Sequence, residues 1–180
     1  GDVNALSPNS AVTIKPGGLL SLDGYDNTIR SLNGDVGEDQ LGGVVDLSPD
    51  CEGESEDSDC FNRRGSYLTI RSGNFSGVID DSQQGVPDVA KQGLIIVGVE
   101  PSDRLTFSGP NSYSSPTFIQ SGALRVGADF ALSENSSHIV LGGELDVRGY
   151  RQVLRNGLDV RGGVLRVESD KPLTVRNEMG

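Results

Sequence analysis

The stretch Leu105–Gly127 reads LTFSGPNSYSSPTFIQSGALRVG and contains the pattern that recurs along the chain. Two runs, Arg104–Ser108 at its start and Ala123–Val126 near its end, place apolar residues among polar ones within a few residues. Such alternation puts successive side chains on opposite faces of a β-strand, one inward and one in water. Gly, Ser, Asn and Pro between the runs end each strand early. The stretch therefore predicts short strands that turn at glycines.

The same pattern predicts sixteen short strands, and no window has a sustained helical period apart from a weak signal at Asp88–Gln92. The chain is therefore predicted to be all-β. The expected strands are Ala11–Ile14, Leu19–Leu22, Thr28–Leu32, Val44–Leu47, Tyr67–Arg71, Ser76–Ile79, Leu94–Val97, Arg104–Ser108, Thr117–Gln120, Ala123–Val126, His138–Leu141, Glu144–Val147, Gln152–Arg155, Leu158–Val160, Val164–Val167 and Leu173–Val175.

These strands are shorter than the roughly five or six residues usual in a β-sandwich. Most breaks are Gly-Gly or Ser-Gly pairs at irregular distances, whereas hairpins prefer Asn-Gly or Asp-Gly directly between two strands. Short strands with glycine corners suit a parallel β-solenoid, in which each strand pairs with its equivalent in the next coil about 4.8 Å away.

The composition excludes several classes of function. The chain has 180 residues, which is enough for one or at most two domains, and its net charge of −11 opposes binding to nucleic acid or to an anionic membrane. It has a single histidine, and no P-loop, G-x-S-x-G or H-E-x-x-H motif. No apolar run reaches the ~20 residues of a membrane helix. We therefore expect no catalytic residues, cofactor or metal.

An internal repeat links the two ends of the sequence. Leu6–Ile14 aligns with Leu132–Val140, and Gly17–Tyr25 aligns with Gly142–Tyr150, with identities at Gly, Leu, Ser, Asn and Tyr. Corners and inward positions are the constrained ones in a repeated structural unit, so this pattern predicts equivalent units. The first copy begins in the middle of a unit, which leads us to expect a fragment of a longer solenoid.

Several motifs resemble the passenger domains of bacterial autotransporters. Leu105–Gly127 is similar to the passenger-associated repeat of that family, and it departs from the usual form at Ser115-Pro116. Gly17–Ile29 and the segment after Gly127 resemble the coil element that commonly follows this repeat, and Gly73–Ile79 resembles an element found upstream. Together these elements cover roughly two thirds of the chain.

The resemblance implies that residues 1–180 are a segment of a right-handed parallel β-helix with three strands per coil. It implies a non-catalytic adhesin or stalk, exported through the periplasm and then displayed at the outer membrane or secreted, whose folding assists its own secretion. The implied partners are a host-cell or extracellular-matrix surface, neighbouring bacteria, and a C-terminal membrane barrel of the parent chain. One alternative is a polysaccharide-cleaving β-helix enzyme, because this fold also carries such activities. The other is a calcium-dependent binding module centred on the acidic loop between Cys51 and Cys60.

Residues 46–62 are expected to form an acidic loop insertion. Cys51 and Cys60 are the only cysteines, and a disulfide between them would close a small ring and imply an oxidising compartment. A free or metal-binding pair is the alternative, although two further zinc ligands are lacking. The acidic side chains in and beside this ring could instead form a solvated protrusion, a weak calcium site or a docking surface for a basic partner: Asp50, Glu52, Glu54, Glu56, Asp57 and Asp59.

The remaining candidate site residues are expected to have structural roles. Asp80-Asp81 is expected to be a charge cluster in a loop, with a catalytic pair as the alternative. His138 is expected at an outward or edge position. Five arginines in the last third are expected to pair with carboxylates on neighbouring coils, with a heparin-like or phosphate-binding patch as the alternative: Arg148, Arg151, Arg155, Arg161 and Arg166. The tyrosines 25, 67, 113 and 150 could stack on sugars, although Tyr25 and Tyr150 are expected to be equivalent corners.

Overall fold

The computed structural model describes residues 6–35, 42–49, 65–81 and 93–176, and in this part of the chain it contains strands and no helix. The predicted all-β class is confirmed, and each of the sixteen predicted runs overlaps one strand. No helix long and apolar enough to cross a membrane is found among these residues. The strands are β1 (Ala11–Ile14), β2 (Leu19–Ser21), β3 (Asn27–Gly34), β4 (Val44–Asp46), β5 (Tyr67–Phe75), β6 (Val78–Asp80), β7 (Leu94–Val97), β8 (Arg104–Phe107), β9 (Thr117–Ile119), β10 (Ala123–Val126), β11 (His138–Val140), β12 (Glu144–Asp146), β13 (Gln152–Leu154), β14 (Leu158–Val160), β15 (Val164–Arg166) and β16 (Leu173–Val175).

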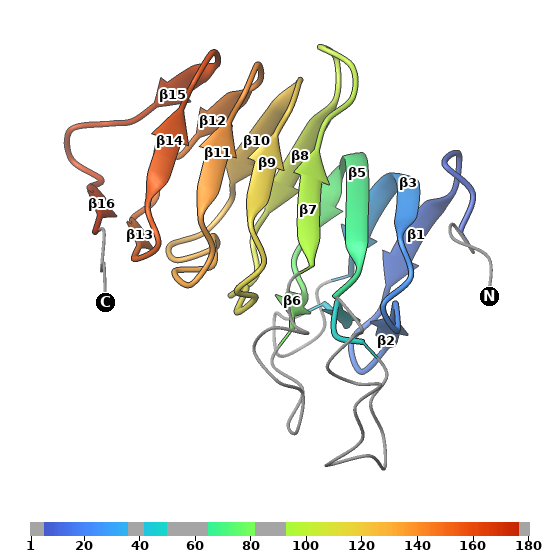
Figure 1. The fold of residues 1–180 in the computed structure, drawn as a ribbon. Coiled ribbons are helices and arrows are strands. Elements are labelled where there is room, and N and C mark those ends of the chain that lie inside the picture. Colours follow the sequence, from blue (N-terminus) through green and yellow to red (C-terminus); the bar gives the residue numbers. More distant parts are fainter. Residues whose placement is uncertain (1–5, 36–41, 50–64, 82–92, 177–180) are drawn as a thin grey trace, which may run out of the picture.

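The pairings between these strands are parallel, and paired strands lie side by side in a row that follows the chain from the N-terminus to the C-terminus (Figure 1). In the second half of the chain the spacing is regular, because Leu105, Leu124, Leu145 and Leu165 occupy successive positions of one ladder. Strands that follow each other directly along the chain do not pair with each other. In this half of the chain each backbone segment is therefore covered by the segment about twenty residues further on.

The ladders form three columns. The first contains the N-terminal halves of β3 and β5, followed by β7, β9, β11 and β14. The second contains β1, the C-terminal halves of β3 and β5, and then β8, β10, β12 and β15. β3 and β5 are longer than predicted because each runs on from the first column into the second. The third column consists of β2, β4 and β6 and, further along the chain, of β13 and β16.

The core lies inside these columns, since every second residue of most strands is buried. Leu105, Leu124 and Leu145 stack at 0% exposure in the second column, and Val97 and Ile119 do so in the first. Full burial of such a side chain contributes roughly 1.5–3 kcal/mol. The apolar residues of successive strands form one continuous buried cluster.

Stacked glycines mark two corners between the columns. One stack, with Gly18, Gly43 and Gly77, precedes the third-column strands, and a Cβ on Gly77 would lie 2.0 Å from the Gly43 carbonyl oxygen. The other stack includes Gly143 and Gly163 and precedes second-column strands, and a Cβ on Gly163 would lie 2.2 Å from the Gly143 oxygen. Backbones approach so closely at these corners that only glycine fits.

The glycine stacks explain why the predicted internal repeat is wrong as a structural equivalence. β1 lies in the second column with β12, whereas the alignment paired it with β11. β2 lies in the third column, whereas its aligned partner β12 lies in the second. Tyr25 and Tyr150 share a local turn after a left-handed glycine, but at different corners. The sequence repeat therefore reflects a local unit of glycine, strand and turn that occurs in more than one column.

Between β6 and β13 the described residues form no third-column strand, and side-chain amides continue the column there. Asn111 accepts a hydrogen bond from the Ile79 N–H at 2.8 Å through Oδ1, and its Nδ2 donates to the Ala131 carbonyl at 2.7 Å. Gln152 accepts from the Leu132 N–H at 3.0 Å, and its Nε2 donates to the Ala128 carbonyl at 2.9 Å. Both side chains are buried, so each amide replaces a backbone pairing between neighbouring segments.

We expect Asn111→Ala to lower the free energy of unfolding by about 2–5 kcal/mol, because it leaves a buried N–H and a buried carbonyl without partners at about 1–3 kcal/mol each. The matched control is Asn135→Ala. Asn135 is exposed and its side chain has no hydrogen bond in the described part of the chain, so the change should stay within about 0.5 kcal/mol. Urea denaturation of both variants measures the difference. Equal losses in the two variants would contradict the proposed role of the buried amide.

Candidate functional site

The residues predicted to form the acidic site lie outside the described part of the chain. This applies to both cysteines and to all six carboxylates, namely Cys51, Cys60, Asp50, Glu52, Glu54, Glu56, Asp57 and Asp59, and to the weak helical signal at Asp88–Gln92. The disulfide and the three interpretations of the loop therefore stay predictions. Among the residues that the structure does describe, no group of three or more His, Cys, Asp or Glu side chains could hold a metal ion.

The pair Asp80-Asp81 has a structural role that neither interpretation predicted. Asp80 ends strand β6 and accepts a hydrogen bond from the Ser112 hydroxyl at 2.9 Å. Asp81 is buried and accepts bonds from the N–H and hydroxyl groups of both Ser114 and Ser115, the shortest at 2.6 Å. These bonds tie β6 to the next segment of the third column. They also occupy both oxygens of the buried Asp81 carboxylate.

The five arginines named above are all paired with carboxylates, but only three of these pairs join neighbouring segments as the interpretation as charge ladders predicted, and Arg148 and Arg161 pair within their own segment. Several pairs join neighbouring segments, including Arg166 with Glu144 at 2.8 Å and Arg155 with Glu134 at 3.0 Å. Asp146 bonds to Arg148 within the same turn, and these hydrogen bonds hold the pKa of Asp146 below its ordinary value. Arg151 pairs with Asp129, and Arg161 pairs with Asp159. This compensation leaves little positive charge for a phosphate or heparin-like ligand.

His138 faces inward and is fully buried, so the predicted outward position is wrong. The phase of β11 explains the difference, because His138 is in register with the buried Thr117 and lies two residues from the buried Val140. Its Nδ1 donates to the Ser136 carbonyl at 3.1 Å, and its Nε2 has no hydrogen-bond partner in the described part of the chain. Burial lowers the pKa of His138 to about 4.

A buried polar network lies beside this histidine. The Tyr113 hydroxyl and Thr117 Oγ1 are 2.9 Å apart, and Thr117 Oγ1 and Ser136 Oγ are 3.2 Å apart. Ser136 Oγ also donates to the Ser115 carbonyl at 2.7 Å. Tyr113 is fully buried and therefore cannot stack on a sugar from solution, whereas Tyr25, Tyr67 and Tyr150 are exposed. The network serves the core and holds adjacent segments together.

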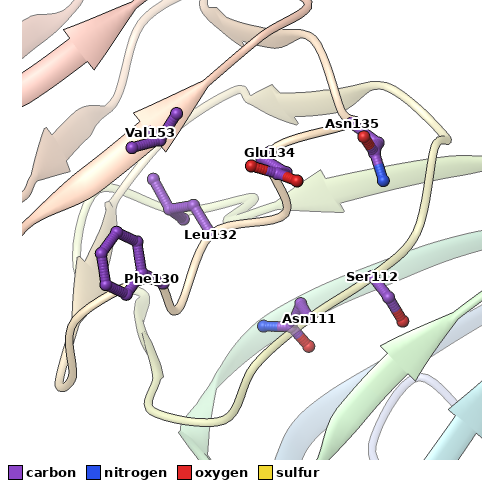
Figure 2. A pocket seen from close by; sticks show the side chains of 7 residues that line it. All are labelled: Asn111, Ser112, Phe130, Leu132, Glu134, Asn135 and Val153. Atoms are coloured by element: carbon purple, nitrogen blue, oxygen red, sulfur yellow. The ribbon is translucent and has the colours of Figure 1, made fainter.

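A groove of about 250 Å³ opens on the third column, where its strands are missing between β6 and β13. Its two walls differ in character (Figure 2). Phe130, Leu132 and Val153 form an apolar side, Asn111 and Ser112 lie opposite, and Glu134 and Asn135 lie at one end. The lining comes from three successive segments of the stack, so the parallel pairing brings together residues more than forty positions apart in sequence.

Phe130 is the most unusual residue of this groove. Its φ is +58°, a left-handed conformation that is rare for an aromatic residue and costs about 1–3 kcal/mol. The side chain is nevertheless 50% exposed. The backbone is held by a hydrogen bond from the Phe130 N–H to the Arg151 carbonyl at 2.8 Å, and the Arg151 guanidinium lies 5.9 Å from the ring centroid.

No residue of the groove was predicted as a site from the sequence. Phe130 lies in GADFAL, where nothing local indicates a left-handed backbone, and Ser112, Glu134 and Asn135 lie in ordinary loop sequence. The only usable signal was the absence of a strand-like run at 110–115 and 130–136, which marks a gap in the third column. Comparisons of the chain with protein-family models, with curated protein sequences and with solved structures found no match.

We expect stability to fall as the pH is lowered from about 6.5 to about 4, because the unfolded chain binds a proton at His138 in this range and the folded chain does not. The shift corresponds to about 3 kcal/mol in total. Above pH 6.5 this contribution is fully present, and below pH 4 it is lost. Urea denaturation across this range should give a shallower pH dependence for His138→Phe, in which the ring is kept but cannot titrate. The same pH dependence in both proteins would show that the titration of His138 is not its cause.

Proposed function

We propose that the chain is a non-catalytic segment of a bacterial autotransporter passenger that acts as an adhesin or stalk at the cell surface. In this proposal it is a right-handed parallel β-helix with three strands per coil and is part of a longer solenoid. The observation that carries the proposal is the parallel ladder whose partners recur about every twenty residues, seen in Leu105, Leu124, Leu145 and Leu165. Right-handedness is expected because almost all connections between parallel strands of one sheet have that hand.

The three columns support three strands per coil. In the second half of the chain, the order β11, β12, β13 and then β14, β15, β16 visits the first, second and third column twice in succession. The interval between paired residues is longer in the first half of the chain, as between Asn27 and Leu68, yet the parallel pairing continues there.

The stacking of one segment on the next is compatible with a chain that folds while it leaves the membrane barrel. Each new segment pairs with the one before it and adds its apolar side chains to the existing cluster, so that folding can proceed one coil at a time. We propose that this stepwise burial on the outer side of the membrane helps to draw the chain through a C-terminal barrel of the parent protein. The displayed surface then contacts a host cell, extracellular matrix or a neighbouring bacterium.

The test is display by a fusion of the chain to an autotransporter barrel. Leu124→Asp places a carboxylate at a fully buried position in the second column, which should cost more than about 4 kcal/mol and stop the stack from growing. We expect surface display, measured with an antibody on intact cells and normalised to total protein, to fall at least several-fold.

The matched control is Arg125→Gln on the same strand, since the Arg125 side chain points outward and its contact with Asp146 is at 3.9 Å. Exposed pairs of this kind contribute about 0–1 kcal/mol, so display of this variant should be unchanged. Normal display of Leu124→Asp would overturn the proposed coupling between folding and secretion.

A further inference from the structure

We propose that the groove between β6 and β13 binds one neutral pyranose unit of a saccharide. The site would contact the sugar through the ring of Phe130 and through polar groups of Ser112, Glu134 and Asn135. This inference deepens the proposed adhesin function by naming a ligand class. It does not depend on surface display, because the groove is part of the folded chain itself.

The size of the groove limits the ligand. Its volume is about 250 Å³, which is below the roughly 300–1,000 Å³ of pockets that hold drug-sized molecules. One sugar-sized ring fills such a space. The groove is lined by segments that succeed one another along the stack, so further units of an oligosaccharide can extend beyond it over the surface.

The division of the groove into two walls matches the two sides of a pyranose. A sugar ring presents C–H groups on its faces and hydroxyls around its edge. Phe130, Leu132 and Val153 offer an apolar wall, and the negative face of an aromatic ring attracts the polarised C–H groups that stack on it (Figure 2). The opposite wall and one end offer hydrogen-bonding groups to the hydroxyls.

These polar groups have capacity left for a ligand. The Asn135 side-chain amide, which has two donors and an acceptor, has no hydrogen bond in the described part of the chain. The Ser112 hydroxyl donates to Asp80 and can still accept. Glu134 accepts from Arg155 at 3.0 Å through one oxygen, and a carboxylate can accept several further bonds. Asn111 is not available, because both ends of its amide hold the backbone.

The charges near the groove favour a neutral ligand over a charged one. Arg155 compensates Glu134, and Arg151 pairs with Asp129 while it also lies over Phe130. An amine would meet a carboxylate that is already paired and a ring that already carries a cation. A uronate or phosphate would approach a chain of net charge −11, beside Asp80 and Glu134.

The backbone at Phe130 gives independent support. A half-exposed aromatic residue at φ +58° gains little for the fold, and strained conformations of this kind cluster at binding sites. The hydrogen bond to the Arg151 carbonyl at 2.8 Å holds the Phe130 backbone, and the guanidinium over the ring favours one orientation of the side chain before any ligand binds. A ring oriented in advance loses little freedom on binding, which favours affinity.

The experiment is an NMR titration of the ¹⁵N-labelled 180-residue chain with the methyl glycosides of glucose, galactose and mannose and with N-acetylglucosamine. Glucuronate and glucosamine serve as charged counterparts. A single small ring in a shallow groove should bind with a dissociation constant of about 1 mM. We expect at least one neutral sugar to shift the amide signals of Phe130, Leu132 and Val153, and the charged sugars to bind at least about tenfold more weakly.

Three variants test whether the sugar binds in the groove. Phe130→Ala should weaken binding at least tenfold, and Asn135→Ala, which changes an exposed side chain and is expected to fold normally, should weaken it several-fold. The matched control Tyr150→Ala removes an exposed aromatic residue that does not line the groove and should bind as the parent does. Spectra outside the groove report whether each variant is folded, and if Phe130→Ala fails to fold, Asn135→Ala decides.

The proposal is overturned if no neutral sugar shifts the groove signals at about 50 mM, far above the expected dissociation constant. It is also overturned if a charged sugar binds more tightly than every neutral one, or if the folded groove variants bind as well as the Tyr150→Ala control. Because this titration uses the isolated chain, its failure would leave the display experiment intact. A failure of display would likewise leave sugar binding standing.

Discussion

The parallel hydrogen-bond ladder between segments about twenty residues apart is the constraint on which the rest of the structure depends. It stacks Leu105 on Leu124 and Leu124 on Leu145, and so makes one continuous core from strands of only three or four residues. A lone strand of that length buries too little apolar surface to be stable. Neighbours on both sides supply the missing contacts, as in other repeat architectures in which each unit contacts only the next.

The candidate site arises where this ladder is incomplete. Among the residues that the structure describes, the third column has no strand between β6 and β13, and the amides of Asn111 and Gln152 carry the hydrogen bonding across the gap. Irregular backbone there allows Phe130 to adopt a left-handed conformation, which a regular strand could not accommodate. The scaffold around the gap stays rigid, since Asp81 and the network of Tyr113, Thr117 and Ser136 tie adjacent segments together. A groove with fixed walls is the consequence.

The sequence predicted the local elements well and their assembly less well, for a physical reason. Strand positions depend on alternation and on turn residues, which are local, so all sixteen runs were found. The column in which a strand lies depends on how many residues separate two corners. The glycine-strand-turn unit looks the same in every column, so the sequence repeat aligned β1 with β11 although β1 lies in the second column and β11 in the first. His138 was misplaced because its outward or inward phase is set by its neighbours Thr117 and Leu158 in the ladder. The groove could not be predicted, because its walls are far apart in sequence and Phe130 carries no local sign of its backbone conformation.

The most direct test of this account is a set of interstrand nuclear Overhauser contacts around Phe118. Phe118 is in parallel register with Ile96 on one side and with Ile139 on the other. The account predicts backbone contacts from Phe118 to both residues, in the staggered amide-to-Hα pattern of parallel strands. Strong Hα-to-Hα contacts between the successive strands Thr117–Ile119 and Ala123–Val126 would instead show an antiparallel hairpin, and would contradict the parallel stack and the function proposed for it.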